Sequence, residues 1–127
     1  MDLLTPLNPS VRMKVTPHFD PTVTVVEPKG SLVGGDVLDD LKTTMHGLLD
    51  AGTHNVVLDL SGVDLVNSTG LGSLISINAA FQEKGGRVKL AGLDKKIKNI
   101  FVLTRLSEVF DIAETQQDAL MDFRHTL

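Results

Sequence analysis

Short runs rich in β-branched residues alternate along the chain with longer stretches of helical periodicity. Apolar and polar residues alternate over 11–16, and 22–27 is rich in valine and threonine, which predicts two strands of a hairpin. Residues 36–50 repeat their apolar positions at steps of three and four, which predicts a helix that Gly52 is placed to end. The apolar run 55–60 is typical of a strand buried on both faces.

The second half of the chain continues this alternation. A wide apolar stripe after Gly70 predicts a helix, and Gly85 and Gly86 are placed to stop it. Thr115 has the spacing of a helix cap before Asp118. The other predicted elements are a strand at 88–91, a helix at 97–104, a strand at 109–113 and a helix at 115–123.

The predicted order of elements is β-β-α-β-α-β-α-β-α, which indicates an α/β protein. A helix between two β-branched runs is most simply a right-handed crossover between parallel strands. We therefore expect a mostly parallel central sheet of four or five strands, an antiparallel edge strand and about four helices. Residues 1–10 contain two prolines and no clear period, so they are interpreted as a tail, and 11–127 as one domain.

Composition narrows the class of protein. The 127 residues suit one domain, and with 42% hydrophobic but only 4% aromatic residues the core must be aliphatic. Cysteine is absent, which excludes disulfides and thiolate metal sites. We expect no transmembrane helix and no signal peptide, and hence a cytoplasmic protein. The net charge of −4 argues against a nucleic-acid partner.

One part of this acidic chain is basic. Two interpretations stay open for it: a solvated helix face, or a docking patch for an acidic partner. The six residues concerned are Arg87, Lys89, Lys95, Lys96, Lys98 and Arg105.

The sequence VDLVNSTGLG, residues 63–72, places Ser68 and Thr69 between an apolar run and a helix. In open α/β sheets functional sites lie at the carboxyl ends of the strands. A helix start also offers unpaired N–H groups and a partial positive charge, which stabilise a phosphate. Either hydroxyl could instead only cap the helix. Gly70 and Gly72 could relieve crowding between the helix and the sheet.

Catalytic patterns are absent from the sequence. A nucleophile elbow has glycine two residues before the serine, whereas Ser68 follows Val66 at that spacing. No Walker loop is present, and no two histidines have metal-ligand spacing. We therefore predict no enzyme activity, no cofactor and no metal. The four histidines are scattered in polar stretches and are expected to be exposed: His18, His46, His54 and His125.

Three segments resemble the STAS domains, and among them the bacterial anti-sigma factor antagonists. Residues 59–72, DLSGVDLVNSTGLG, are similar to the family pattern D-L-S-x-V-x-F-h-D-S-S/T-G-L-G, where h is apolar. Residues 83–90 resemble its K-x-x-G-G-x-h-x-h segment, and 104–112 fit T-x-L-x-x-x-F-x-I. The segments agree in order and distance, and the similarity spans about 11–123.

The resemblance implies a sheet of four or five strands with helices, and it implies a function. Such antagonists bind an anti-sigma factor that is a serine kinase with a histidine-kinase-like ATPase fold. The kinase phosphorylates the antagonist and so releases it, and a PP2C-type phosphatase resets it. On this chain the phosphorylated residue corresponds to Ser68, with Thr69 the weaker candidate. The implied partner surface comprises Asn67, Ser68, Thr69, Gly70, Leu71 and Gly72, with neither nucleic acid nor direct membrane insertion.

Two departures from the family pattern leave an alternative open. The family's aspartate before the serine is Asn67, and residues 30–33, GSLV, replace a segment that usually carries two acids. A STAS scaffold that is never phosphorylated, as a subunit of a signalling or lipid/anion transport complex, would suit these losses. In either case we expect the α-helix after Ser68 to turn its apolar stripe inward, with Ser73, Ser76 and Asn78 outward.

Overall fold

The computed structural model describes residues 13–18 and 22–126, with side chains as far as Arg124. The predicted tail 1–10, the first two residues of the first predicted strand and the side chain of His125 lie outside this part of the chain. The description below concerns the described residues.

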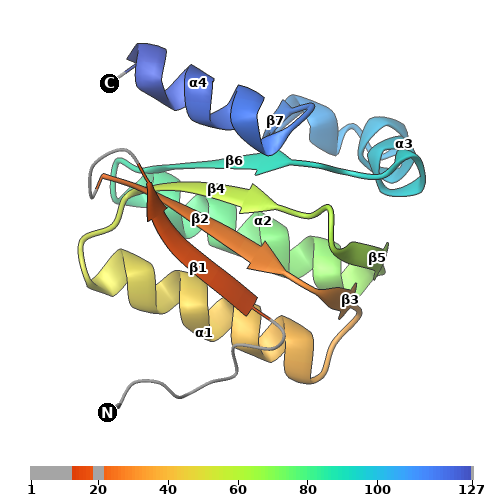
Figure 1. Cartoon of the computed structure of the whole chain (residues 1–127). Coiled ribbons are helices and arrows are strands. Elements are labelled where there is room, and N and C mark those ends of the chain that lie inside the picture. The colour runs from red at the N-terminus through yellow and green to blue at the C-terminus, as the bar shows by residue number, and fades with distance from the viewer. Residues whose placement is uncertain (1–12, 19–21, 127) are drawn as a thin grey trace.

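A five-stranded sheet forms the centre of the molecule, in the order β1-β2-β4-β6-β7 (Figure 1). The β1–β2 pair is antiparallel and the other three pairs are parallel. The predicted sheet of mostly parallel strands with one antiparallel edge is therefore confirmed. The strands are β1 (Met13–His18), β2 (Val23–Pro28), β4 (Asn55–Asp59), β6 (Arg87–Ala91) and β7 (Asp111–Ala113).

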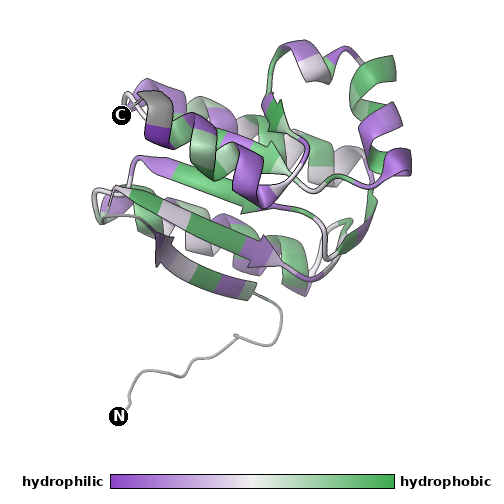
Figure 2. Ribbon diagram, turned by 45° about the horizontal axis from the view of Figure 1, so that its top comes forward, coloured by the Kyte–Doolittle hydropathy of each residue, from purple (hydrophilic) through white to green (hydrophobic). Residues whose placement is uncertain are grey.

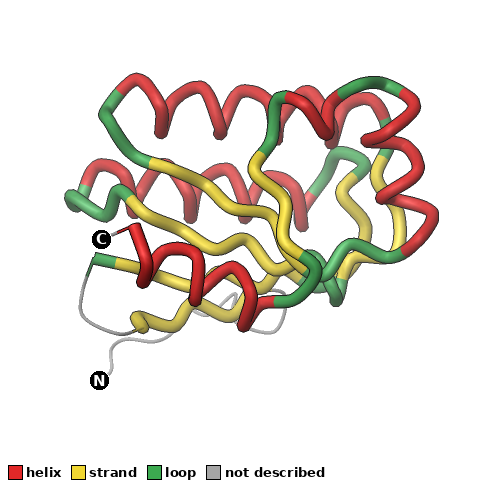
Figure 3. Tube along the Cα trace, turned by 90° about the horizontal axis from the view of Figure 1, so that it is seen from above, coloured by secondary structure: helices red, strands yellow, loops and turns green. Residues whose placement is uncertain are grey.

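Four α-helices cover the sheet, as the periodicity predicts. Helices α1 and α2 lie on one face and α4 lies on the other, which Figures 1 and 3 both show. A short 3₁₀ helix, η3, precedes the last predicted strand, and residues 109 and 110 form a turn and a bend, so the strand begins only at Asp111. The helices are α1 (Asp36–Asp50), α2 (Ser68–Glu83), α3 (Lys95–Leu103), η3 (Leu106–Glu108) and α4 (Gln116–Thr126).

The larger core lies between the sheet and helices α1, α2 and α3. Leu38, Leu41 and Met45 recur along α1 at helical spacing, and all three are buried. The central strands are mainly hydrophobic, in keeping with burial on both faces (Figure 2). The rings of Phe101 and Phe110 pack edge to face with their centroids 5.4 Å apart, so α3 is anchored to the segment before β7.

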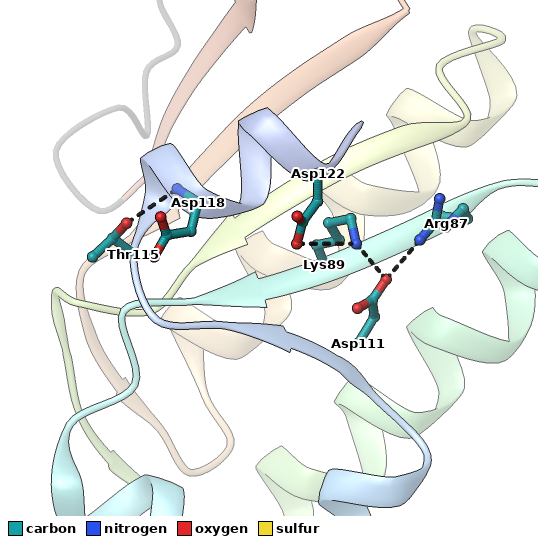
Figure 4. A network of polar contacts seen from close by, with 6 residues as sticks. All are labelled: Arg87, Lys89, Asp111, Thr115, Asp118 and Asp122. Carbon is teal, nitrogen blue, oxygen red and sulfur yellow. Dashed lines mark hydrogen bonds and ion pairs between the residues drawn. The ribbon is translucent and has the colours of Figure 1, made fainter. Parts of the chain in front are cut away.

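The opposite face holds a smaller core under α4 and a polar network (Figure 4). Lys89, with 4% of its side chain exposed, lies 2.6 Å from Asp111 and 3.8 Å from Asp122, and Arg87 also bonds Asp111. Burial alone raises the pKa of Asp111, but the hydrogen bonds from Lys89 and Arg87 outweigh it, so the pKa lies below the usual 3.8. The six basic residues noted in the sequence therefore do not all lie on one helix face, because these two lie on β6.

A second, two-stranded sheet was not predicted. Strand β3 (Gly30–Leu32) pairs in parallel with β5 (Val63–Val66), outside the central sheet. The sequence signals are weak because β3 has only three residues, begins with a glycine and is soon followed by Gly34 and Gly35. Ser68 and Thr69, called the serine-threonine corner below, therefore follow a strand of this small sheet and not a strand of the central one.

Candidate functional site

Asn67 joins β5 to α2 and caps the helix. Its backbone is extended, and its Oδ1 accepts a hydrogen bond from the backbone N–H of Gly70 at 3.0 Å. The interpretation of Ser68 or Thr69 as the cap is therefore wrong, since the residue before them takes that role. Both are exposed, and within the described part of the chain neither hydroxyl has a hydrogen-bond partner.

The other end of the Asn67 amide holds the loop that leads into α1. Its Nδ2 donates a hydrogen bond to the carbonyl oxygen of Val33 at 3.1 Å, and its backbone N–H donates to the carbonyl of Leu32 at 3.3 Å. An aspartate could keep the cap but could not donate to Val33. The asparagine at position 67, where the family pattern has aspartate, thus connects the start of α2 to the β3–α1 loop.

Gly70 allows α2 to begin against β3. A Cβ placed on Gly70 would lie 2.0 Å from the carbonyl oxygen of Leu32, a distance that no side chain can occupy. The prediction that this glycine relieves crowding between helix and sheet is confirmed. For Gly72 it is wrong, because a Cβ there would meet nothing within 4 Å.

The glycine pair before α1 belongs to the site. Gly34 and Gly35 have φ of 99° and 96°, which favours glycine. A Cβ on Gly34 would lie 3.9 Å from Cγ2 of Thr69, so the loop passes beside the threonine. Since Gly35 directly precedes α1, the first turns of α1 and α2 border the same corner.

The charges around the corner are unequal. The first turn of α2 contains no acidic residue, so no side chain offsets the partial positive charge of the helix start. The first turn of α1 contains Asp36 and Asp39. Asp64 of β5 accepts a hydrogen bond of 2.7 Å from the hydroxyl of Ser31, which stands in the segment that usually carries acids. The corner therefore offers hydroxyls and N–H groups in a setting flanked by carboxylates.

The exposed face of α2 extends the corner into a surface. Ser68, Gly72, Ile75, Ser76 and Ala79 are all exposed at helical spacing. Ser76 thus faces outward as predicted. Ile75 was expected in the inward stripe but is exposed, because the stripe is wider than the face that packs on the sheet.

Asn78, predicted to face outward, is only 5% exposed, so that prediction is wrong. It precedes the buried Phe81 by three residues and therefore shares its face. Ser73 is half-buried. Leu65 of β5, which the sequence did not indicate, is exposed shortly before the corner.

Other candidate chemistry is not gathered at the corner. His18, His46 and His54 are exposed as predicted. Among the described residues no three histidine or carboxylate side chains are grouped as metal ligands would be. No helix in that part of the chain has both the length and the apolar character needed to cross a bilayer.

Comparisons with known proteins agree with this architecture. The model of the STAS domain family matches residues 10–119, and the chain belongs to that family. An anti-sigma-B factor antagonist from Staphylococcus epidermidis is 26% identical over 86 residues, covering 65% of this chain and 80% of the relative.

Two solved structures share the fold. An anti-sigma factor antagonist from Mycobacterium paratuberculosis superposes with a TM-score of 0.69 at 24% identity, covering 88% of this chain and 94% of the other. The Bacillus cell fate determinant SpoIIAA in its phosphorylated form superposes with a TM-score of 0.68 at 13% identity. The superposition covers 87% of this chain and 98% of SpoIIAA. At these identities the similarity establishes the fold alone.

Proposed function

We propose that the chain is an anti-sigma factor antagonist whose binding to an anti-sigma factor is switched off by phosphorylation of Ser68. The observation that carries the proposal is the state of the Ser68 hydroxyl. It is exposed at the first position of α2, and the capping role that would engage it belongs to Asn67. The curated relative named as an anti-sigma-B factor antagonist supports the role of antagonist, and the phosphorylated SpoIIAA structure is that of a protein with the same fold.

The switch needs no change of fold. A phosphate adds about −1.5 to −2 charges at pH 7. The uncompensated start of α2 stabilises that charge in the free protein. When a partner covers the exposed face of α2, the same charge must be desolvated or set against partner acids, which costs several kcal/mol. Phosphorylation therefore lowers the affinity for the partner while the domain stays folded.

The proposed partners follow from the proposed switch. The anti-sigma factor is a kinase with a histidine-kinase-like ATPase fold, which supplies the phosphoryl group, and a PP2C-type phosphatase removes it. The chain itself acts as a binding module in the cytoplasm and contributes the hydroxyl. The exposed side chains of Leu65 and Ile75 provide apolar contact area around it.

Phosphate is expected on Ser68 and not on Thr69. With the anti-sigma factor of the same organism and ATP, the wild type and Thr69→Ala should become phosphorylated, whereas Ser68→Ala should not. Mass spectrometry of the peptide that contains both residues locates the phosphate. Phosphate on Thr69 alone would contradict the assignment, and no phosphate on any variant would favour the unphosphorylated scaffold.

Asn67→Asp should lower stability and raise the rate of phosphorylation. The variant loses the donor to Val33 and places a carboxylate near that carbonyl oxygen, which costs about 1 kcal/mol at an exposed position. The restored charge lets the kinase orient the Ser68 hydroxyl, so turnover rises while affinity stays within a few-fold. Urea denaturation and phosphorylation time courses measure the two effects.

Asn67→Ser is the matched control for this prediction. Serine can keep the helix cap but loses the donor to Val33 without adding charge. It should lose similar stability and gain no phosphorylation rate. Equal rates for the wild type and Asn67→Asp would show that the charge has no part in the reaction.

A further inference from the structure

Helix α4 covers the face of the central sheet that α1 and α2 leave open (Figures 1 and 3). The side chains of Ala119, Leu120 and Phe123 are buried against that face. The other side chains described on α4 are exposed or half-buried, and Met121 is 47% exposed. Few apolar contacts therefore hold α4, and the core beneath it is much smaller than the core under the other helices.

Both of the charged residues that are buried in the described part of the chain contact α4. Lys89 of β6 points toward the helix, where its Nζ lies 3.8 Å from a carboxylate oxygen of Asp122 and 5.3 Å from the centre of the Phe123 ring (Figure 4). Asp59, at the end of β4, accepts a hydrogen bond of 2.7 Å from the side-chain amide of Gln116. Docking of α4 thus helps to remove a cation and an anion from water.

The ion pair with Lys89 holds α4 only weakly. Taking an ion out of water costs free energy, which a salt bridge offsets only when its contacts are short and well aligned. The pair of Lys89 and Asp122 is long at 3.8 Å, whereas Asp111 of β7 lies 2.6 Å from the same Nζ atom. Because Asp111 belongs to the sheet, the shorter ion pair remains when α4 leaves, and Lys89 is then hydrated.

The start of α4 is also linked to the strand that precedes the serine-threonine corner. Oδ2 of Asp59 accepts the bond from Gln116, the first residue of α4, and Oδ1 accepts a bond of 2.9 Å from the backbone N–H of Ser61. Ser61 lies in the turn between β4 and β5. One carboxylate therefore contacts both α4 and the turn that leads into β5, and opening of α4 removes one of its two contacts.

We propose that α4 is a detachable cover, which leaves the sheet as a unit while the rest of the domain stays folded, and that the buried charge of Lys89 keeps its docking weak. Segments with few buried apolar contacts open at a lower free energy than the core of a domain. The opening uncovers the apolar sheet face that Val23, Val25 and Val57 form. The inference goes beyond the proposed function, because it does not depend on phosphorylation of Ser68.

Amide hydrogen exchange of the full chain, followed residue by residue by NMR, tests the proposal. The amides of residues 120–124 should share one protection factor, at least about 100-fold below those of the β4 and β6 amides. A shared value distinguishes opening of the whole helix from fraying at its end. Protection equal to that of β4 and β6 would overturn the proposal, because α4 would then open only when the whole domain unfolds.

Lys89→Met should slow the exchange of the α4 amides by about ten-fold, since an apolar side chain in place of a buried ion pair is often stabilising. Neither carboxylate is left buried without a partner, because Asp111 keeps its bond to Arg87 and Asp122 is exposed. Lys84→Met makes the same change at an exposed lysine after α2 and should leave the exchange of α4 unchanged. Unchanged or faster exchange in Lys89→Met would show that the buried charge does not weaken docking.

Leu74→Ala separates opening of α4 from global unfolding. Leu74 is buried in the larger core and stays buried when α4 leaves, so the cavity destabilises the closed and the open form alike. The α4 amides should therefore exchange as in the wild type, while the β4 and β6 amides exchange at least about 30-fold faster. Ile77→Val, a smaller deletion in the same core, takes its place if Leu74→Ala does not fold.

Leu120→Ala is the matched change within α4. It removes an apolar contact that only the closed form makes, so the α4 amides should exchange at least about 30-fold faster than in the wild type. The contrast between the two leucines decides the question. If Leu74→Ala or Ile77→Val speeds the exchange of α4 by the same factor as that of β4 and β6, then α4 is not a separate unit and the proposal is wrong.

Discussion

Gly70→Ala should cost about 3 kcal/mol of unfolding free energy or more, at the upper end of what overpacking produces. The added Cβ would lie 2.0 Å from the carbonyl oxygen of Leu32, and the two atoms nearest to it are backbone, which cannot rotate away. Helix α2 must then move from β3 and lose the packing at its start. Domains of this kind have only about 5–15 kcal/mol of stability, so the change should be plain in urea denaturation.

Gly72→Ala is the matched control, two residues further along the same helix. A Cβ at Gly72 meets nothing within 4 Å, and alanine favours a helix over glycine by about 1 kcal/mol. This variant should therefore be as stable as the wild type or more so. Equal destabilisation by both substitutions would show that the close approach of α2 to β3 is not what requires the glycine.

Phosphorylation of Ser68 should weaken binding to the anti-sigma factor by roughly 100- to 1,000-fold. The reason is that several kcal/mol of charge repulsion and desolvation enter the complex, and about 1.4 kcal/mol is a factor of ten. Isothermal titration calorimetry with the unmodified and the fully phosphorylated chain measures the difference. Ser68→Glu should show a smaller loss, because one carboxylate has less charge than a phosphate.

The main sheet and the helices could be predicted because their signals are local. The apolar repeat of α1 and the β-branched runs of β2 and β4 each fix an element within a single window of sequence. The same apolar pattern placed Ser68 between a strand and a helix, and the structure has it at the first position of α2.

The contacts that shape the corner could not be predicted, because they join residues far apart in the chain. The hydrogen bond from Asn67 to Val33 spans 34 residues, and the approach of Gly70 to Leu32 depends on a strand of three residues. The inward turn of Asn78 and the exposure of Ile75 depend on how α2 is rotated against the sheet. The spacing of apolar residues predicts that a helix has an apolar stripe, but it does not predict which residues of that stripe face the sheet.

The central claim is most directly tested by the release of a sigma factor in a reconstituted system. The sigma factor bound to its anti-sigma factor is mixed with the unmodified chain or with the chain phosphorylated at Ser68, and free sigma factor is measured. The account predicts release by the unmodified chain, little release by the phosphorylated chain, and recovery after treatment with a PP2C-type phosphatase. Equal release by both forms would contradict it.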